Sequence, residues 1–410
     1  MYDTTNPGGM YETQNPGGSN TPNTPGDLTY YTGTFYSMGT VITLGVFSKT
    51  QNEANDIYND IKEIYDTYDN ISDDGYDIYS PQSYDSELAK LNKDRSMVVS
   101  DELYELLEFA VYMKEETKGY FNPFLGELNH LWKRYIGYVD KIPPNAGDKA
   151  CFTRIAQDTY LEFGENNLVT IKNDNTPNEA LIDLGGIAKG FATNKAYLYF
   201  KSHDIKYYLL NAGSSNLLMG ENYNSPGFNI ILSYVFNYPN EDPIISKADG
   251  FWYLDGVSLG LEAGKEASSS YGNTLPKSNE GNNGDLFFYM NGNQNTIYIK
   301  EGGQWKNKKT IGITSFLSSN EAVVTSSPSE QNRFENNTCY HHLISPFTGE
   351  PVNFVSSVTV LGEDSGRLDA LSTALFVMPD DVRNKYIEEN NLRVIITKDE
   401  KIIKDTRTKA

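Results

Sequence analysis

Hydrophobic and polar residues follow two different periods along this chain, which together predict a mixture of strands and helices. From Thr34 to Phe47 apolar and polar residues alternate, which is typical of a strand. Residues 52–69 have the pattern of an acidic helix. A clearer helix is predicted from Asp101 to Thr117, where Leu103, Leu106, Leu107, Ala110 and Val111 share one face and Gly119 follows the end.

The second half of the chain begins and ends with regular elements and has a different composition between them. Strands are predicted at residues 207–210, 357–361 and 393–397, and a helix at 368–377. Residues 238–309 are rich in Gly, Asn and Ser and contain short aromatic strands, at 286–289 and 296–299. We interpret 238–309 as an exposed, β-rich insertion with little catalytic content.

The first 27 residues contain a near repeat, in which Tyr2–Gly9 is followed by the similar Tyr11–Gly18 and then by Thr-Pro-rich sequence. This composition predicts a disordered tether at 1–27. The folded domain is then expected at 28–404, including the insertion. A tether of this kind is typical of a surface-anchored protein, so we expect an extracytoplasmic, membrane-anchored lipoprotein whose signal is absent from this sequence.

Charge and composition narrow the classes of ligand. The 410 residues carry a formal charge of −21, with a pI of about 4.6, which opposes binding to nucleic acid or to anionic lipid. A phosphate-bearing substrate would therefore require a divalent cation. No stretch approaches the roughly 20 apolar residues that span a bilayer, so we expect the chain as given to be soluble. Cys151 and Cys339 could form a bridge or remain free thiols.

The segment from Asp183 to Gly190 brings a carboxylate, two adjacent glycines and a lysine to one predicted turn between a strand and a helix. The apolar run 180–182 suits a buried strand. The following helix is predicted from helical spacing of Ile187, Ala188, Phe191, Ala192, Ala196 and Leu198. Bare N–H groups at a helix N-terminus bind anions, and Lys189 adds positive charge, so the turn predicts a phosphate cradle. The alternative is an ordinary glycine-rich turn with a surface lysine.

Two further segments carry polar groups of interest. Asp369 and Thr373 are four residues apart on a predicted helix, where both side chains share a face and offer the oxygen ligands that suit Mg²⁺. The alternative is a helix residue with a buried hydroxyl. His341 and His342 are adjacent on a predicted strand, so at most one of them can reach a given site. Thr325 begins a hydroxyl-rich turn that could contact phosphate.

Eight motifs in this order resemble the ApbE family of FAD:protein FMN transferases. The resemblance covers roughly residues 33–404, interrupted by the insertion. The motifs are Met38-Gly39-Thr40, Ser86-Glu87-Leu88 through Leu91-Asn92, Gly119-Tyr120-Phe121-Asn122-Pro123 with Gly126 and Leu131-Trp132, Asp183 to Gly190, Asn211-Ala212-Gly213, Thr325-Ser326, His342 to Gly349, and Asp369 to Thr373.

The resemblance implies an α+β fold with a mixed central sheet, flanking helices and FAD in a cleft between two halves. It implies Mg²⁺-dependent transfer of FMN from FAD to a threonine hydroxyl of a partner protein, with release of AMP. The partner would be an acceptor of a flavin-based electron-transfer system. Carried over by position, the FAD contacts would be Met38, Tyr79 (or Tyr84), Tyr120, Phe121, Asn122, Asp183, Lys189, Thr325 and His342. The metal would be held by the Gly186 carbonyl, Asp369 and Thr373, and His342, Asp369 and Lys189 would be catalytic.

The chain departs from the family pattern at three positions. Asn122 stands where the family commonly has an acid, Ser327 replaces a glycine, and Ser345 replaces an acid before Pro346. Two other functions therefore remain as alternatives. One is an FAD pyrophosphatase, in which water replaces the threonine, and the other is a surface protein that binds FAD without chemistry.

Overall fold

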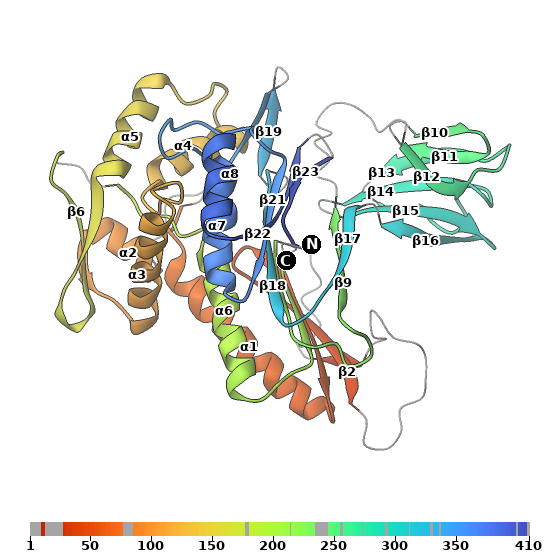
Figure 1. Cartoon of the computed structure of the whole chain (residues 1–410), viewed down its shortest axis with the longest axis horizontal. Helices are drawn as coiled ribbons and strands as arrows, with labels where there is room; N and C mark the ends of the chain where they lie inside the picture. Colours follow the sequence, from red (N-terminus) through yellow and green to blue (C-terminus); the bar gives the residue numbers. More distant parts are fainter. Residues whose placement is uncertain are drawn as a thin grey trace.

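The computed structural model describes residues 10–12, 28–76, 85–176, 180–213, 215–233, 245–254, 257–272, 274–291, 294–310, 312–328, 331–335, 338–398 and 401–407. A nine-stranded sheet lies at its centre (Figure 1). Its strands, in spatial order, are β1 (Tyr11–Glu12), β2 (Thr29–Ser37), β3 (Thr40–Ser48), β7 (Tyr208–Ala212), β8 (Asn216–Met219), β18 (Glu321–Ser326), β21 (Ser357–Gly362), β22 (Arg393–Lys398) and β23 (Lys401–Asp405).

Every pairing within this central sheet is antiparallel. The predicted α+β class is confirmed, but the mixed central sheet is corrected to an antiparallel one. The long connection from β3 to β7 contains six of the described helices, and β7 still runs antiparallel to β3. When a connection begins and ends at the same end of two neighbouring strands, the two strands run antiparallel.

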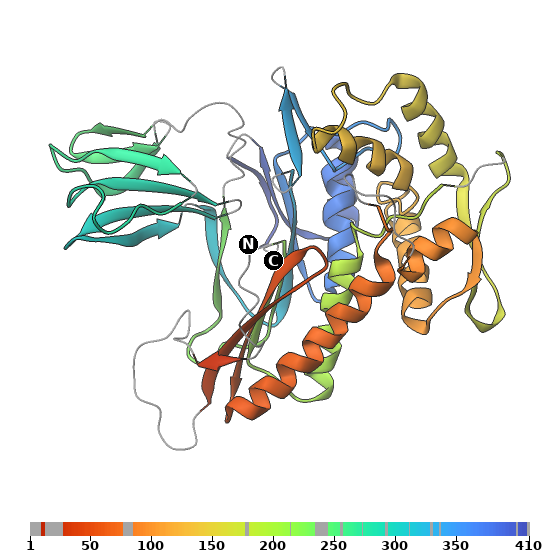
Figure 2. The ribbon, with the colours of Figure 1, turned by 180° about the vertical axis from the view of Figure 1, so that it is seen from behind.

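Helices of the described chain lie in two groups. The first group packs on one face of the central sheet and comprises α1 (Gln51–Ser72), α6 (Ala188–Ser202) and α7 (Ser365–Val377), with α8 (Asp380–Glu389) beside them (Figures 1 and 2). The second group lies beyond them and comprises α2 (Glu87–Asp94), α3 (Asp101–Glu116), α4 (Gly126–Ile136) and α5 (Ala146–Asp158). A short sheet accompanies the second group: β4 (Ser96–Val98), β6 (Leu168–Asn173) and β5 (Thr159–Phe163), with the 3₁₀ turn η1 (Glu165–Asn167).

The insertion forms a lobe that projects from the central sheet (Figure 1). One of its sheets contains β10 (Ile245–Ala248), β11 (Phe251–Leu254) and β12 (Val257–Glu262). The other contains β13 (Ser269–Gly272), β14 (Leu286–Asn291), β15 (Gln294–Glu301) and β16 (Gln304–Thr310). The chain enters through β9 (Phe228–Ser233) and leaves through β17 (Gly312–Ser318), which pair antiparallel, and a separate hairpin joins β19 (Asn332–Glu335) to β20 (Thr338–His341).

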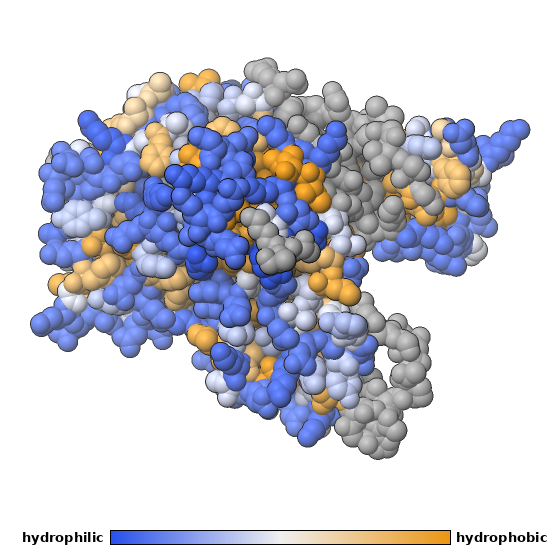
Figure 3. All heavy atoms as spheres, in the orientation of Figure 1, coloured by the Kyte–Doolittle hydropathy of each residue, from blue (hydrophilic) through white to orange (hydrophobic). Residues whose placement is uncertain are grey.

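Two hydrophobic cores correspond to these parts. The main core is continuous from α1 and α3 through α6 and α7 to the central sheet. The lobe has a small core of its own around Trp252 and Phe288, both at most 1% exposed. Outside the cores, the face drawn in Figure 3 is mostly hydrophilic, with hydrophobic residues in small separate groups.

Most predicted elements are confirmed, and one helix face is corrected. The helix predicted from Asp101 is α3, and the strands at 357–361 and 393–397 are β21 and β22. Leu198, which we placed on the buried face of α6, is 48% exposed, and Phe200 is buried instead. Phe200 continues the row of buried residues Ala192 and Ala196, which are spaced four apart, and this row faces the core.

The N-terminal segment predicted as a tether lies largely outside the described residues. Met10, Tyr11 and Glu12 are described, and they lie against the domain through β1. Cys151 and Cys339 are both free thiols, one exposed and one buried. No helix within the described ranges has the length and apolarity needed to cross a membrane.

Candidate functional site

The first residues of α6 touch the middle of α7, and this contact is the centre of the site. The Gly190 N–H donates to Asp369 Oδ2 at 2.8 Å, in a buried position. A Cβ at position 190 would lie 2.4 Å from Asp369 Cβ and 2.5 Å from the Ser365 carbonyl oxygen. Only glycine therefore allows the two helices to approach so closely, and the contact fixes the Asp369 carboxylate.

Gly186 lies against α7 near Thr373, one helical turn after Asp369. A Cβ built on Gly186 would be 3.5 Å from the Phe121 ring and 3.6 Å from Thr373 Oγ1. Thr373 lies one turn after Asp369 on α7, as predicted. Of the predicted site residues, the structure thus gathers Phe121, Gly186, Asp369 and Thr373 around the α6–α7 contact.

Ser326, at the end of β18, completes this group; the sequence analysis named it within the Thr325-Ser326 motif but not among the site residues. Its hydroxyl lies 2.7 Å from Ser372 Oγ and 3.4 Å from Thr373 Oγ1. The Thr325 hydroxyl lies 2.9 Å from Thr359 Oγ1 on the neighbouring strand, and the predicted contact of Thr325 with FAD stays a prediction. Successive strand residues point to opposite faces, so the member of the pair that faces α7 is Ser326.

The oxygen groups at this contact fit the magnesium ion that the family resemblance implies. Asp369 is 8% exposed and offers a carboxylate, while Thr373 offers a hydroxyl next to the backbone of Gly186. Such hard oxygen donors suit Mg²⁺, which keeps part of its shell for water and phosphate. Among the described residues, no cluster of three or more His, Cys, Asp or Glu side chains is placed to hold a metal.

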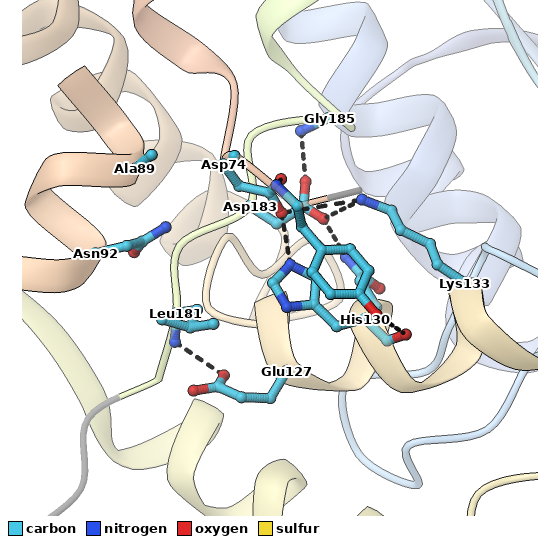
Figure 4. A network of polar contacts seen from close by, with 12 residues as sticks. Asp74, Ala89, Asn92, Glu127, His130, Lys133, Leu181, Asp183 and Gly185 are labelled. Carbon is cyan, nitrogen blue, oxygen red and sulfur yellow. Dashed lines mark hydrogen bonds and ion pairs between the residues drawn. The ribbon is translucent and has the colours of Figure 1, made fainter. Parts of the chain in front are cut away.

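Residues 180–184 lead into the predicted phosphate cradle, and residues 180–182 do not form the predicted strand. Their backbone groups bond to side chains and to the segment that leads into α4, where the Gly126 N–H donates to the Leu181 carbonyl and the Asp183 N–H donates to the Pro123 carbonyl. Ile182 exchanges two hydrogen bonds with the Asn92 amide, at 2.8 and 2.9 Å. The Leu181 N–H donates to Glu127 Oε2 at 2.8 Å (Figure 4). Apolar content predicted the burial correctly, but these side-chain partners on α2 and α4 replace a ladder.

Asp183 is held at the start of the turn by groups from α4. Its Oδ2 accepts from Asn129 Nδ2 at 2.8 Å and lies 3.4 Å from Lys133 Nζ, and its Oδ1 accepts from the Gly185 N–H at 2.8 Å (Figure 4). Burial alone would raise the pKa of Asp183, but the Lys133 ammonium and these two donors lower it to about 2. Asp183 is therefore a fixed, ionised carboxylate.

The same lysine joins a second carboxylate to this network. Lys133 Nζ lies 3.9 Å from Asp74 Oδ2, which is also 2.8 Å from His130 Nε2. The Tyr76 ring stacks on the His130 imidazole, with centroids 3.7 Å apart and planes 9° from parallel. The sequence analysis named none of Asp74, Asn129, His130 and Lys133. The only available signal was their helical spacing, since 129, 130 and 133 share one side of α4.

The turn from Asp183 to Lys189 has the features of an anion cradle. α6 begins at Ala188 without a side-chain cap. The Gly185 N–H is taken by Asp183, whereas the N–H groups of Gly186 and Lys189 donate to no described residue. The Lys189 ammonium likewise has no hydrogen-bond or ion-pair partner within the described part of the chain. Two N–H groups and one cation thus stand at the positive end of α6.

Met38 and Gly39 form the tight turn between β2 and β3, beside the Asn211–Gly213 turn. Both have positive φ, 51° and 71°, as a two-residue hairpin of this type requires. A Cβ on Gly213 would lie 2.3 Å from Thr40 Oγ1, so the two turns are in direct contact. Met38 is partly buried against the main core. Two motifs far apart in sequence therefore meet at one end of the central sheet.

Two of the three departures from the family pattern are involved in local turns. Asn122 Oδ1 accepts from the Phe124 N–H at 3.0 Å, and its Nδ2 donates to the Ala156 carbonyl at 3.4 Å. Ser345 Oγ accepts from the Phe347 N–H at 3.3 Å. These polar groups stabilise the loops that hold Tyr120 against Phe347, whose ring centroids are 4.9 Å apart.

The two adjacent histidines are distinguished by their burial. His341 is fully buried, its Nδ1 accepts from the Leu343 N–H, and its Nε2 donates to the Val352 carbonyl. Burial, with His342 nearby, lowers the pKa of His341 to about 4, so it is neutral. His342 is half-buried, with Nδ1 3.3 Å from the Gln331 carbonyl oxygen. Of the pair, only His342 has access to solvent.

Tyr79 and its alternative Tyr84 lie outside the described residues, so their predicted flavin contact stays a prediction. The FAD cleft between two halves also stays a prediction. Two surface pockets, of about 420 and 360 Å³, lie near Gly119 and near Phe347, and Asp369 and Thr373 line neither of them.

Comparison with known proteins matches most of the chain to one family. The model of the ApbE family matches residues 38–241 and 284–396 and omits 242–283, which belong to the lobe. The chain is 24% identical over 349 residues to an FAD:protein FMN transferase of Treponema pallidum, covering 83% of this chain and 76% of that protein. It is 22% identical over 341 residues to the FAD:protein FMN transferase of Vibrio cholerae, covering 82% and 80%.

Solved structures show the same fold. The flavin transferase ApbE from Vibrio cholerae superposes with a TM-score of 0.58 at 18% identity, covering 90% of this chain and 93% of that one. The ApbE protein from Thermotoga maritima gives a TM-score of 0.59 at 21% identity, covering 90% and 94%. The predicted family resemblance and the α+β class are both confirmed.

Proposed function

The chain belongs to the ApbE family, and from this premise we propose that it transfers FMN from FAD to a threonine hydroxyl of a target protein, releasing AMP. The hydrogen bond between the Gly190 N–H and Asp369 carries this proposal. It joins the start of α6, where we propose that phosphate binds, directly to the oxygen groups on α7. The relatives named FAD:protein FMN transferase support the same activity.

The pyrophosphate of FAD is assigned to the turn before α6. The N–H groups of Gly186 and Lys189 and the Lys189 ammonium would offset its negative charge. This local positive charge matters because the whole chain carries −21, which would otherwise repel an anionic substrate. By family resemblance, we propose that Met38, Tyr120, Phe121 and Asp183 contact the rest of FAD.

Magnesium would be held by the Gly186 carbonyl oxygen, the Asp369 carboxylate and the Thr373 hydroxyl. When bound there, it would supply charge neutralisation at the pyrophosphate. The chain's own part is to fix these groups. Gly190 holds Asp369 from one side, and Ser326 with Ser372 borders Thr373 from the other.

In the proposed reaction the threonine oxygen attacks the phosphorus on the FMN side of FAD. A bond forms between that oxygen and phosphorus, and the bond to the bridging oxygen breaks, so that AMP leaves with the electron pair. The threonine proton passes to His342, which is the solvent-accessible member of the pair. Lys189 offsets the charge that develops on the departing AMP.

A direct assay tests this proposal. The purified chain is incubated with FAD, Mg²⁺ and an acceptor domain bearing an accessible threonine. AMP is followed by chromatography and the acceptor by intact mass spectrometry. We expect an acceptor that gains the mass of FMN, with one AMP released per adduct, and loss of both signals when EDTA removes the metal.

The alternatives give different results in the same assay. AMP without an adduct on any acceptor tested would favour the pyrophosphatase. Bound FAD without AMP would favour a binding protein and would contradict the catalytic assignment of Asp369. An acceptor threonine changed to alanine is the matched control, because it should abolish the adduct while FAD binding persists.

We also propose that the protein acts outside the cytoplasm as an anchored lipoprotein, with an acceptor from a flavin-based electron-transfer system. The support is the composition of the N-terminal residues, which resembles a tether between an anchor and a domain. Fractionation of cells that express the native gene tests this. Recovery of the protein in the membrane fraction is expected, and recovery in the cytoplasm would contradict it.

A further inference from the structure

The segment Met10–Glu12 lies at the edge of the central sheet, beside β2. Residues 13–27 separate it in sequence from the rest of the domain. β1 pairs antiparallel with β2, with Tyr11 opposite Thr32 and Glu12 opposite Tyr31. The residue before β1 is Met10, which is fully buried in the main core. Extended peptides that add a strand to a sheet edge gain affinity from the main chain and specificity from side-chain pockets.

Both backbone groups of Met10 are bound by side chains of α1. The Met10 N–H donates to Asn55 Oδ1 at 2.8 Å, and Gln51 Nε2 donates to the Met10 carbonyl oxygen at 2.7 Å. These residues are four apart on α1 and therefore share a face. Buried main-chain groups require such partners. The helix thus recognises the backbone of this one residue from both sides.

The side chain of Met10 fills a space that depends on a glycine. A Cβ built on Gly33 would lie 2.8 Å from Met10 Sδ and 2.9 Å from the Tyr58 ring. The thioether therefore rests on the bare backbone of Gly33, next to an aromatic ring, a contact that sulfur favours. We call the space lined by Thr32, Gly33, Gln51, Asn55 and Tyr58 the methionine groove.

The chain contains two copies of the sequence that occupies this groove. Met1-Tyr2-Asp3-Thr4-Thr5-Asn6-Pro7-Gly8-Gly9 is followed directly by Met10-Tyr11-Glu12-Thr13-Gln14-Asn15-Pro16-Gly17-Gly18. The repeat is therefore nine residues long and begins at the buried methionine. The two copies differ only by Asp for Glu at the third position and by Thr for Gln at the fifth. Everything that the groove contacts in Met10 is also present in Met1.

We propose that the methionine groove is a binding site for the Met-Tyr-acid motif and that the first copy, Met1–Asp3, is its second occupant within the same chain. The two copies then compete for one groove. When the second copy is bound, residues 13–27 span the distance to Leu28, and when the first is bound, residues 4–27 do so. The linker 4–27 is longer than 13–27, so it can also reach the groove. Its greater length makes binding of the first copy about twofold less favourable in loop-closure entropy.

Oxidation of methionine by dilute hydrogen peroxide measures this competition in the full chain. Sulfoxide formation at Met1 and Met10 is followed by peptide mass spectrometry, against a synthetic peptide of residues 1–18 as the unprotected reference. With a twofold preference, the groove holds Met10 in about two-thirds of the molecules and Met1 in about one-third. Oxidation should then be about threefold slower at Met10 and about 1.5-fold slower at Met1 than in the reference. The Met10→Asp variant should leave the groove to the first copy, and Met1 should then oxidise at least roughly tenfold more slowly than the reference.

Met219, which is fully buried elsewhere, reports in every variant whether the domain is folded. If Met1 in Met10→Asp oxidises at the reference rate while Met219 stays protected, the first copy does not bind and the proposal fails. Met10→Gln, a milder change, should give the same protection of Met1 if Met10→Asp disturbs folding. Protection of Met1 that disappears on tenfold dilution would mean binding to a second molecule and would also overturn the proposal.

The groove itself is tested with the double variant Gln51→Ala and Asn55→Ala. It removes both side chains that bind the Met10 backbone. We expect Met1 and Met10 to oxidise at the reference rate together, with Met219 still protected. Unchanged protection of Met10 in this variant would show that the two side chains do not hold the segment.

Discussion

The α6–α7 contact and the lobe are both buried assemblies, but they are built from different kinds of contact. At the α6–α7 contact, residues 179 apart in sequence meet through Gly190 and Asp369. In the lobe, strands such as β14 and β15 pair with their immediate neighbours around a small core. The geometry of the site therefore depends on the whole main body, whereas the lobe is held mainly by local pairing.

The largest effect on activity should come from the carboxylate at the α6–α7 contact. Asp369→Ala removes a proposed metal ligand, and the loss of several kcal/mol of charge stabilisation corresponds to a transfer rate on the order of 10²–10³-fold lower. The rate of adduct formation at saturating FAD and Mg²⁺ measures this. Asp381→Ala, on the exposed start of α8, is the control and should keep the normal rate. Full activity of Asp369→Ala would remove the metal assignment.

The next largest effect should follow from separating the two helices without changing any charge. Gly190→Ala introduces a Cβ 2.5 Å from the Ser365 carbonyl oxygen. Overpacking of this kind typically costs about 1–3 kcal/mol of unfolding free energy, and the displaced carboxylate should lower transfer on the order of 10–10²-fold. Urea unfolding and the transfer assay measure the two effects.

Gly147→Ala is the matched control for that substitution, because Gly147 also lies in a helix. A Cβ there meets only the Asn145 side chain, at 3.2 Å. Alanine should therefore leave stability unchanged or raise it by up to about 1 kcal/mol. Equal stability of Gly190→Ala and Gly147→Ala would contradict the close-approach argument.

A smaller effect, visible mainly as pH dependence, is expected on the α4 side of the cradle. Lys133→Gln leaves the buried Asp183 carboxylate without its ammonium and should cost roughly 1–3 kcal/mol of stability near pH 7. In the native chain the pKa of Asp183 is about 2, below its ordinary value of 3.8. This carboxylate therefore stabilises the fold above about pH 4, and the contribution is lost as pH falls towards 2.

In the Lys133→Gln variant this dependence should weaken, because the ammonium no longer lowers the pKa of Asp183. Chemical unfolding between pH 2 and pH 7 compares the two proteins. We expect their stability difference to shrink as the pH falls through this window. A difference that stays constant with pH would mean that Lys133 acts through packing alone.

The smallest effect on transfer should come from the lobe. Trp252→Ala removes the largest side chain of its core and should destabilise the lobe by roughly 3–5 kcal/mol. Hydrogen exchange should then rise in β11, β12 and β14 while β18 and β21 stay protected. The rate of transfer to a small acceptor should change less than about twofold. A large loss of transfer would show that the lobe supports the site.

The sequence was most informative where structure is local. Helix α3 was predictable because its apolar residues, its Ser100 cap and the following Gly119 all lie within twenty residues. The family motifs similarly marked Gly186, Asp369 and Thr373. The proximity of Ser326 to Thr373 was not predictable from the motif alone, because the register of β18 against α7 decides which hydroxyl faces α7.

Long-range side-chain partners were not predictable from the chain alone. Residues 180–182 look like a strand because burial and extension are encoded locally, but Asn92 and Glu127 supply their hydrogen bonds. Lys133 gave no signal, because an isolated lysine on a helix usually faces water. Met10 was hidden for the opposite reason, since the polar residues around it dominate the composition of its segment.

The antiparallel ribbon of β9 and β17 makes the lobe a natural site for protein engineering. Ser233 and Gly312 are direct register partners, so the whole lobe enters and leaves the body at neighbouring positions. Paired residues in antiparallel strands lie about 5 Å apart, a distance that a short turn can close. A reporter domain with adjacent termini could therefore be grafted between them, and its signal would report on the body without interrupting the central sheet.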